Sequence, residues 1–482
     1  MQEVTLLING EDCGASTGKT FERINPANQS IASCAAAASL EDADTAVAAA
    51  KAAFPPWAKL SPTERRKRLL RAADLMDERT SRFIEAGVAE TGATPGWYGF
   101  NVELAANMLR EAAAMTTQIQ GSVIPSDVPG NIAMAVRQPC GVVLGMAPWN
   151  APVILGTRAV AMPLACGNTV VLKASEACPA VHRLIGTVLD EAGLGPGVVN
   201  VLTHAAEDAP AIVERLIANP AVRRVDFTGS TRVGRIVAQL AARHLKPALL
   251  ELGGKAPVVV LDDADLDAAV GAIAFGSYFN QGQICMSTER VIVDAKVGDA
   301  FVDKLTAKAK SLRAGDPNDG SPLGVLESAA AGERLQELIE DACAKGAILP
   351  AGCSIAGTVM QPVIVDGVTQ EMKLFAEESF GPVVTVQRVC GDDEALRAAN
   401  NSEYGLSAAV FSRDISRALL IAQRIETGIC HINGATVHDE AQMPFGGIKQ
   451  SGYGRFGSSA SVAEFTELRW ITIQTGTRHY PI

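Results

Sequence analysis

Short apolar runs of strand length alternate with helical segments over most of this chain, and this alternation constrains the fold more than any other feature. The expected strands are residues 141–144, 169–172, 198–202, 222–227, 258–261 and 291–293. The expected helices are residues 40–53, 61–77, 179–192, 233–243, 266–275 and 299–311. Strands that alternate with helices form βαβ units, so we expect an α/β protein with mostly parallel sheets.

The alternation is present twice, once before about residue 250 and again from 258 to about 410. A chain of 482 residues is too long for one hydrophobic core, so we predict two α/β domains joined near residues 251–255. Residues 118–137 fit neither domain and are typical of an extended hairpin with a turn at Pro129-Gly130. The tail, 467–482, alternates like an edge strand. Such strands either pair with another subunit or lie as ordinary edge strands on the surface.

Charge and cysteine content exclude several classes of protein. The formal net charge of −11 argues against a nucleic-acid partner, which would require a basic face. The N-terminus lacks a secretory signal, no apolar run is long enough to span a bilayer, and we expect a cytoplasmic protein. None of the ten cysteines forms a Cys-x-x-Cys pair and the six histidines show no ligand spacing, so we expect no metal site and no disulfide framework.

Two segments have features of a dinucleotide site. A glycine-containing turn, 228–234, links an expected strand to an expected helix, where backbone N–H groups and the helix terminus can hold a phosphate. The turn does not match the Gly-x-Gly-x-x-Gly dinucleotide motif. An ordinary tight turn between strand and helix is therefore about as favoured as a phosphate site. Lys173 and Glu176 follow another strand, where an acid can bind ribose hydroxyls and repel a 2′-phosphate. A charged loop without a ligand is the alternative.

Three further residues suggest covalent catalysis. Cys285 lies among small and polar residues with no cysteine nearby, as a nucleophile would. Glu251 follows an apolar run, where burial would raise its pKa and suit it to general base catalysis; a salt bridge with Lys255 is the alternative. Asn150 could donate to an oxyanion, together with the backbone N–H of the nucleophile, although an asparagine there is more often a turn residue.

Seven segments together closely resemble the NAD(P)-dependent aldehyde dehydrogenases. They are PWN at 148–150, KASE at 173–176, FTGSTRVG at 227–234, ELGGK at 251–255, GQIC at 282–285, EESFGP at 377–382 and PFGGIKQSG at 444–452. The likeness runs from about residue 5 to the end, in order and at the family's spacing. It implies the family fold: a Rossmann-like cofactor domain, an α/β catalytic domain and a β arm for oligomerisation.

The resemblance assigns a role to each of these segments. Cys285 would be the nucleophile, Glu251 the base, and Asn150 with the Cys285 N–H the oxyanion hole. The residues implied to bind the cofactor are Pro148, Trp149, Lys173, Glu176, Phe227, Gly229, Ser230, Val233, Gly234, Leu252, Glu378 and Phe380. NAD is favoured over NADP because of Glu176. An aldehyde would form a thiohemiacetal with Cys285, lose hydride to the cofactor and leave a thioester that water resolves.

The resemblance also divides the chain into parts. Residues 1–117 and 138–250 would form the NAD-binding domain, 251–435 the catalytic domain, and 118–137 with 467–482 the oligomerisation arm. Residues 436–466 would return to the cofactor domain. A homodimer or a dimer of dimers is implied.

A second group of residues suggests which aldehyde is oxidised. Ala151, Leu155 and Arg158 are spaced to share one helix face that would border the route to Cys285. The aromatic-rich segment 96–101 supplies Trp97, Tyr98 and Asn101, and Ile284 and Met286 flank the nucleophile. Core packing of the aromatic residues is the alternative. These residues could build a flat apolar slot for a ring, with Arg158 or Asn101 bonding ring oxygens.

Residues 285–290, 96–101, 118–121 and 478–482 resemble the branch of the family that oxidises aromatic aldehydes. Vanillin is the expected substrate, and salicylaldehyde, 4-hydroxybenzaldehyde and benzaldehyde are alternatives. An aliphatic or semialdehyde substrate is a more remote alternative. A CoA-acylating enzyme is another, and such an enzyme would not need Glu251 as a water-activating base.

Overall fold

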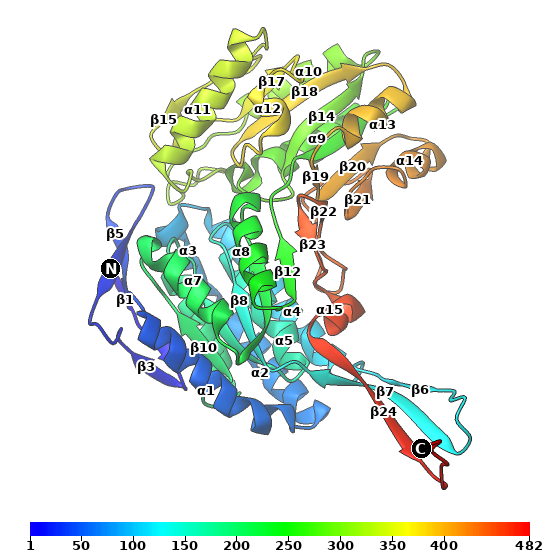
Figure 1. The fold of residues 1–482 in the computed structure, drawn as a ribbon. Helices are drawn as coiled ribbons and strands as arrows, with labels where there is room; N and C mark the ends of the chain where they lie inside the picture. Colours follow the sequence, from blue (N-terminus) through cyan, green and yellow to red (C-terminus); the bar gives the residue numbers. More distant parts are fainter.

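A computed structural model describes all residues, 1–482, and contains two large sheets with a projecting arm (Figure 1). The first sheet has the order β23-β12-β11-β8-β9-β10-β2-β3. Its strands are β2 (Leu6–Ile8), β3 (Glu11–Cys13), β8 (Val142–Met146), β9 (Thr169–Lys173), β10 (Val199–Leu202), β11 (Val222–Thr228), β12 (Ala248–Glu251) and β23 (Gly452–Tyr453). The central strands from β12 to β10 are parallel, so their carboxyl ends share one edge.

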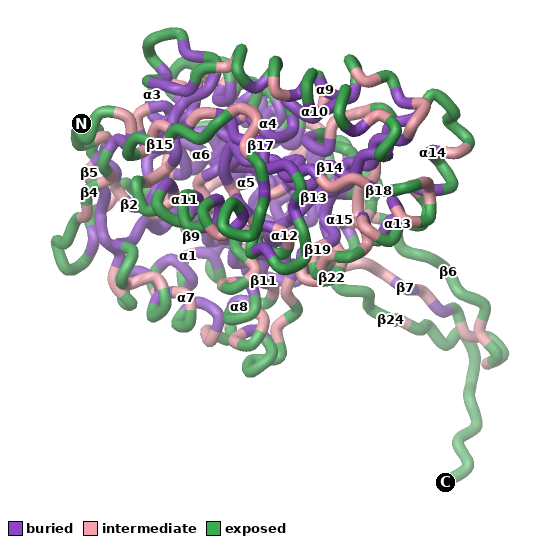
Figure 2. The backbone as a smooth tube through the Cα atoms, turned by 90° about the horizontal axis from the view of Figure 1, so that it is seen from above, coloured by how far each residue is buried: buried purple, intermediate pink, exposed green.

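Helices cover both faces of this sheet. One face packs on α1 (Leu40–Ala58), α7 (Ala209–Ala218) and α8 (Thr231–Arg243). The other packs on α2 (Pro62–Glu78), α3 (Thr80–Thr91), α4 (Pro95–Met115), α5 (Pro152–Ala165) and α6 (Pro179–Glu191). Buried residues concentrate in these layers (Figure 2).

The second sheet is entirely parallel and has the order β17-β18-β14-β13-β20-β21. Its strands are β13 (Ala256–Val260), β14 (Thr288–Asp294), β17 (Val363–Asp366), β18 (Val383–Val389), β20 (Ser407–Phe411) and β21 (Ile429–Ile432). Its helices are α9 (Leu266–Tyr278), α10 (Gly298–Lys310), α11 (Ala329–Ala344), α12 (Lys373–Ala376), α13 (Asp392–Asn400) and α14 (Ile415–Ala422). The predicted α/β class with mostly parallel sheets is confirmed.

The arm is a three-stranded antiparallel sheet that projects from the body (Figures 1 and 2). Its strands are β6 (Ser122–Ile124), β7 (Asn131–Pro139) and β24 (Thr466–Gln474). The expected hairpin is present, and Gly130 has a φ of 71°, which a turn tolerates best with glycine. The tail strand ends at Gln474, so residues 475–482 are not strand, contrary to the expectation from the alternating pattern.

The remaining elements are short. They are β1 (Gln2–Val4), β4 (Thr20–Ile24) and β5 (Ile31–Ala36) in one small sheet, the pairs β15 (Ile355–Ala356) with β16 (Val359–Met360) and β19 (Tyr404–Gly405) with β22 (Ile448–Lys449), the turns η1 (Ala206–Asp208) and η2 (Phe279–Gly282), and α15 (Ser458–Glu464). No helix in the structure has the length and apolar character needed to cross a membrane.

Helix boundaries differ from the expected ones for local reasons. The helix expected to end at 53 continues through Pro55 and Pro56 to Ala58, and the buried Trp57 packs in the core of the first domain. The helix expected from 233 begins at Thr231, because Ser230 caps it by accepting the Val233 N–H. Pattern reasoning places such ends only to within a few residues.

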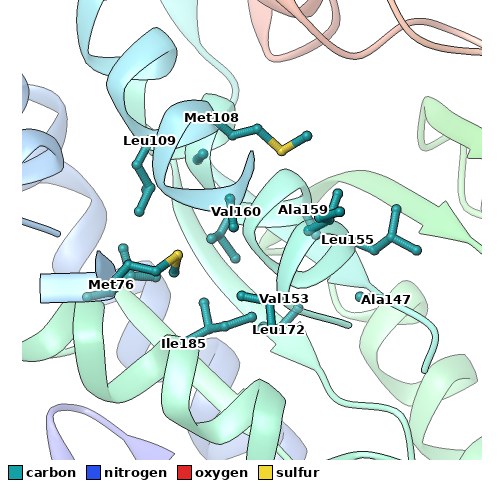
Figure 3. Close-up of a cluster of buried hydrophobic side chains, with 14 of the residues drawn as sticks. Met76, Met108, Leu109, Ala147, Val153, Leu155, Ala159, Val160, Leu172 and Ile185 are labelled. Atoms are coloured by element: carbon teal, nitrogen blue, oxygen red, sulfur yellow. The ribbon is translucent and has the colours of Figure 1, made fainter. Parts of the chain in front are cut away.

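Helix α5 is held in place by core packing against its neighbouring elements. Figure 3 shows Val153 and Val160 of α5 packed among side chains of neighbouring elements. These neighbours are Leu172 of β9, Ile185 of α6 and Met76 of α2. Because interiors of this kind are close-packed, α5 presents its remaining face at a defined position.

Asp226, a buried carboxyl in the first sheet, lacks any hydrogen-bond partner and supports a stability prediction. Both Asp226 oxygens on β11 are buried without a hydrogen bond, and burial raises the pKa of this group far above its usual range. A raised folded pKa stabilises the fold at low pH, and this contribution is lost as pH rises above the unfolded pKa. We expect Asp226→Val to raise stability at pH 8 by about 1–3 kcal/mol, the cost of one unsatisfied buried polar group.

Thermal unfolding of both proteins between pH 4 and pH 8 checks this expectation. The gain in Tm for Asp226→Val should grow with pH. A variant that is less stable than the parent at pH 8 would show that Asp226 has a favourable partner in solution.

Candidate active site

Cys285 lies in a tight loop between α9 and β14 that requires unusual backbone angles. Asn280, Gln281 and Gly282 have successive φ values of 48°, 56° and 67°. A side chain at Gly282 would collide with the Gly381 carbonyl, so only glycine fits there. The Ser287 hydroxyl donates to the Gly282 carbonyl at 2.9 Å and closes the loop. The half-buried Cys285 is thus held at one place beside the first domain.

Asn150 reaches this loop from the end of the segment before α5. Its Nδ2 donates to the Gln283 carbonyl at 3.0 Å, which places the amide next to the nucleophile loop. Its own carbonyl accepts 3.0 Å hydrogen bonds from Trp97 Nε1 and Asn280 Nδ2. The side-chain amide predicted to stabilise an oxyanion and its backbone are therefore both held by hydrogen bonds.

Glu251 ends β12 and is 1% exposed, with no hydrogen-bond partner on either carboxyl oxygen. Burial raises the pKa of Glu251 to about 8; the nearby charge of Arg158 opposes this shift, and those of Asp439 and Glu378 add to it. The alternative ion pair with Lys255 is wrong, because Lys255 Nζ contacts Glu289 Oε2 at 2.5 Å. A solvent-excluded carboxyl that titrates near neutrality can act as a base.

The surroundings of Cys285 favour its protonated thiol. Burial raises the pKa of Cys285 well above its ordinary value, and the nearby Glu251 and Glu378 raise it further. Because burial disfavours the bare thiolate, its formation requires nearby hydrogen-bond donors or a base that accepts the proton.

A cavity of about 310 Å³ opens onto Cys285 and has a mostly apolar wall. Its lining residues are Trp97, Phe100, Leu104, Asn150, Ala151, Ile154, Leu155, Arg158, Phe275, Phe279, Ile284, Cys285, Met286, Val437, His438, Asp439 and Phe445. Trp97 meets Phe279 edge-on with ring centroids 4.9 Å apart, and Phe275 stacks on Phe279 at 4.8 Å. Such a wall suits a flat aromatic ring.

Helix α5 contributes the expected face to this cavity. Ala151, Leu155 and Arg158 all line it, together with Ile284 and Met286 from the nucleophile loop. Arg158 is not a free donor, however. It forms a buried ion pair with Asp439, and its guanidinium lies 4.2 Å from the centroid of the Phe445 ring.

Two residues expected in the cavity are elsewhere. Tyr98 is fully buried in the core beside Gly87, and its hydroxyl bonds Thr91 Oγ1 at 2.8 Å. Asn101 is fully buried and donates to the Trp97 carbonyl one turn earlier in α4 at 2.9 Å. Neither lines the cavity, because α4 turns those side chains into the helical layer. Both assignments to the substrate pocket are corrected.

The edge formed by the carboxyl ends of β9, β11 and β12 has the features of a dinucleotide site. Gly229 and Ser230 join β11 to α8, and the Phe227 ring packs so closely on Gly229 that a side chain there would collide with it. Gly234 is packed against Leu252 in the same way, and Val233 occupies the first turn of α8. A strand, a close turn and a helix N-terminus in this order can hold a pyrophosphate.

The segments that follow β8 and β12 contact the segment that precedes β18. The Trp149 and Phe380 rings meet edge-on at 5.8 Å, and Pro148 precedes Trp149 in the chain. Glu378 Oε1 accepts the Gly254 N–H at 3.0 Å, and burial raises the pKa of Glu378 to about 7. A side chain at Gly253 would collide with the Glu378 carboxyl. Glycine at this position therefore lets the backbone after β12 approach Glu378 closely.

A buried ion pair supports the loop that carries Glu378 and Phe380. Glu289, paired with Lys255, also accepts the Ser379 and Phe380 N–H groups at 2.8 and 3.1 Å. Phe380 has a φ of 50°, a strained value that these hydrogen bonds help to maintain. Motif reasoning did not assign this supporting role to Glu289.

Several cavity residues were missed by sequence reasoning. Val437, His438 and Asp439 belong to no motif and follow β21, far along the chain from Cys285. Phe275 and Phe279 lie in α9 and the following turn, shortly before Cys285 in the sequence. This short separation was the one signal that could have assigned them to the cavity.

Comparison with known proteins agrees with this geometry. The model of the "Aldehyde dehydrogenase family" matches residues 14–471. A vanillin dehydrogenase of Pseudomonas sp. (strain HR199 / DSM 7063) is 70% identical, and the match covers 100% of both chains. A salicylaldehyde dehydrogenase of Pseudomonas putida is 49% identical over 99% of each chain. The crystal structure of a salicylaldehyde dehydrogenase from Pseudomonas putida G7 complexed with salicylaldehyde superposes with a TM-score of 0.98, at 48% identity over 100% of both chains.

Proposed function

The chain belongs to the aldehyde dehydrogenase family, an NAD(P)-dependent family, and we propose that it oxidises vanillin to vanillate with NAD. The observation that carries this proposal is the aromatic-walled cavity that ends at Cys285. The 70% identity to a vanillin dehydrogenase over the full length supports the choice among aromatic aldehydes, because the salicylaldehyde dehydrogenase is 49% identical.

The proposed reaction begins with the side chains around Cys285. The Cys285 thiol loses its proton to solvent, and Sγ bonds to the aldehyde carbon. The developing oxyanion is received by Asn150 Nδ2 and the Cys285 N–H. The bound dinucleotide supplies the hydride acceptor, and the substrate remains as a thioester on Sγ. Glu251 then takes a proton from water, which attacks the thioester carbon, releases the carboxylic acid and restores the thiol.

The residues at the carboxyl ends of β9, β11 and β12 suit a dinucleotide. The close turn at Gly229 and the helix cap at Ser230 would hold the pyrophosphate, and Lys173 with Glu176 would hold the adenosine ribose. Glu378 would hold the other ribose, and Phe380 with Trp149 would border the nicotinamide. NAD is favoured because the Glu176 carboxylate would repel a 2′-phosphate.

A steady-state panel of aldehydes with both cofactors tests the proposal. We expect kcat/KM for vanillin with NAD to exceed that for benzaldehyde, salicylaldehyde and butanal. A higher kcat/KM for salicylaldehyde would favour a salicylaldehyde dehydrogenase instead. A higher kcat/KM with NADP would reject the proposed role of Glu176. Analysis of the product with and without added CoA distinguishes the acid from an acyl-CoA.

Ala151 offers a direct test of the cavity. We expect Ala151→Phe to lower kcat/KM for vanillin by about 10²-fold or more, because the new ring would fill space at the start of α5 beside Cys285. Activity with acetaldehyde should be largely kept, since a small substrate still reaches the thiol. The matched control, Ala151→Ser, adds one oxygen and little volume. Equal losses for both aldehydes in Ala151→Phe would mean that the cavity is not the ring site.

The arm supports a further proposal, that it pairs with a second copy of the chain in a homodimer or a dimer of dimers. Its Val123 and Trp470 are 74% and 76% exposed, large apolar surfaces for a free monomer. Sedimentation at micromolar concentration should report a dimer or tetramer, and a monomer would reject the proposal.

A further inference from the structure

A buried histidine contacts the lysine assigned to the adenosine ribose. Lys173 ends β9, and His204 follows the neighbouring parallel strand β10, in which Leu202 is in register with Lys173. Lys173 Nζ and His204 Nε2 are 2.8 Å apart. His204 is fully buried, and no motif includes it.

The hydrogen bonds of His204 determine its tautomer. Its Nδ1 lies 2.8 Å from the Ala205 carbonyl, which can only accept, so Nδ1 carries a proton. Nε2 faces an ammonium group, which can only donate, so Nε2 holds a lone pair. The ring is therefore neutral. Burial, and next the charge of Lys173, lower the pKa of His204, which keeps it neutral at physiological pH.

The lysine has one side-chain hydrogen bond, and it is the one to His204. The other titratable groups near the ammonium are Glu176 and Cys178. Without an acceptor at Nε2, the strongest attraction on Nζ would come from Glu176. An ion pair between Lys173 and Glu176 would occupy both groups that are proposed to hold the ribose.

We propose that His204 is a positioning residue that holds the Lys173 ammonium apart from Glu176, so that its remaining two N–H donors face the ribose hydroxyls. This inference rests on the cofactor-binding role proposed above for Lys173 and Glu176. A neutral acceptor suits this task, because it fixes the lysine without neutralising its charge.

A second neutral histidine fixes the rest of the same segment. The Ser175 N–H donates to His182 Nδ1 at 3.0 Å, and burial lowers the pKa of His182 to about 3. His182 thus holds the backbone between Lys173 and Glu176, while His204 holds the lysine side chain.

Titration of NADH binding by fluorescence, without any aldehyde, tests the proposal. We expect His204→Leu to raise the Kd for NADH about tenfold, the loss of one hydrogen bond to a charged group. His204→Gln, whose Oε1 replaces Nε2 as acceptor, should recover most of the affinity. His204→Asn, which is polar but shorter, should resemble His204→Leu, and it keeps the test available if the leucine variant does not fold. The exposed His244→Leu is the matched control and should bind NADH like the parent.

A double-mutant cycle shows whether His204 acts through Lys173. In a Lys173→Met background, His204→Leu should cause no further loss of NADH affinity. Equal penalties in both backgrounds would overturn the proposal, as would an unchanged Kd in His204→Leu and His204→Asn. KM for vanillin should stay unchanged in every His204 variant. Because NADH binding needs no aldehyde, these results are independent of whether vanillin is the substrate.

Discussion

Cys285→Ala is expected to reduce kcat for vanillin oxidation by at least about 10⁴-fold, because the variant has no group that can form the thiohemiacetal. The Kd for NADH should change little, since Cys285 is not among the residues that are proposed to hold the dinucleotide. NADH formation followed at saturating vanillin, together with a fluorescence titration of NADH, measures both quantities.

Cys430→Ala is the matched control for this prediction. Cys430 is half-buried like Cys285 but lies in β21 and outside the cavity. It should keep the activity of the parent. A Cys285→Ala protein that retained a tenth of the parent rate would contradict a covalent mechanism at this residue.

Glu251→Gln is expected to slow turnover by about 10²–10⁴-fold, the usual contribution of a general base. If Glu251 acts mainly on the thioester, rapid mixing should still give a burst of up to one NADH per active site, followed by a slow steady phase. The burst should be smaller or absent if Glu251 is also the only acceptor for the thiol proton.

The pH dependence separates this role from a structural one. The base must be deprotonated to act, and its pKa is about 8, so kcat of the parent should rise as pH increases through about 8. Glu251→Gln should lose this rise. Glu103→Gln, an exposed residue of α4 that does not line the cavity, is the control and should keep it. A Glu251→Gln protein with the parent's rate and pH profile would show that another group is the base.

The fold could be anticipated because its strands and helices carry local signals. Buried strands such as Ala256–Val260 are continuous apolar runs in this chain. The hairpin at 118–137 was marked by its Pro-Gly turn. Strand pairing and the order of the strands depend on contacts between distant segments, and the pattern of single segments does not contain them.

Some residues of the candidate site could be predicted from the sequence, and others could not. Cys285, Asn150 and Glu251 belong to recognisable segments, and the structure brings all three together. The errors arose in α4, where helical spacing predicted which residues share a face but not what each side chain contacts. Trp97 reaches the cavity, whereas Asn101 on the same face bonds back to its own helix. Asp439 was unpredictable, because only the folded chain brings it to Arg158.

The measurement that tests the central claim most directly is mass spectrometry of Glu251→Gln quenched during its burst with vanillin and NAD. The account predicts a vanilloyl group on the peptide that contains Cys285, in an amount equal to the NADH formed in the burst. An unmodified Cys285 peptide in a sample that has formed burst NADH, or the acyl group on another cysteine, would contradict it.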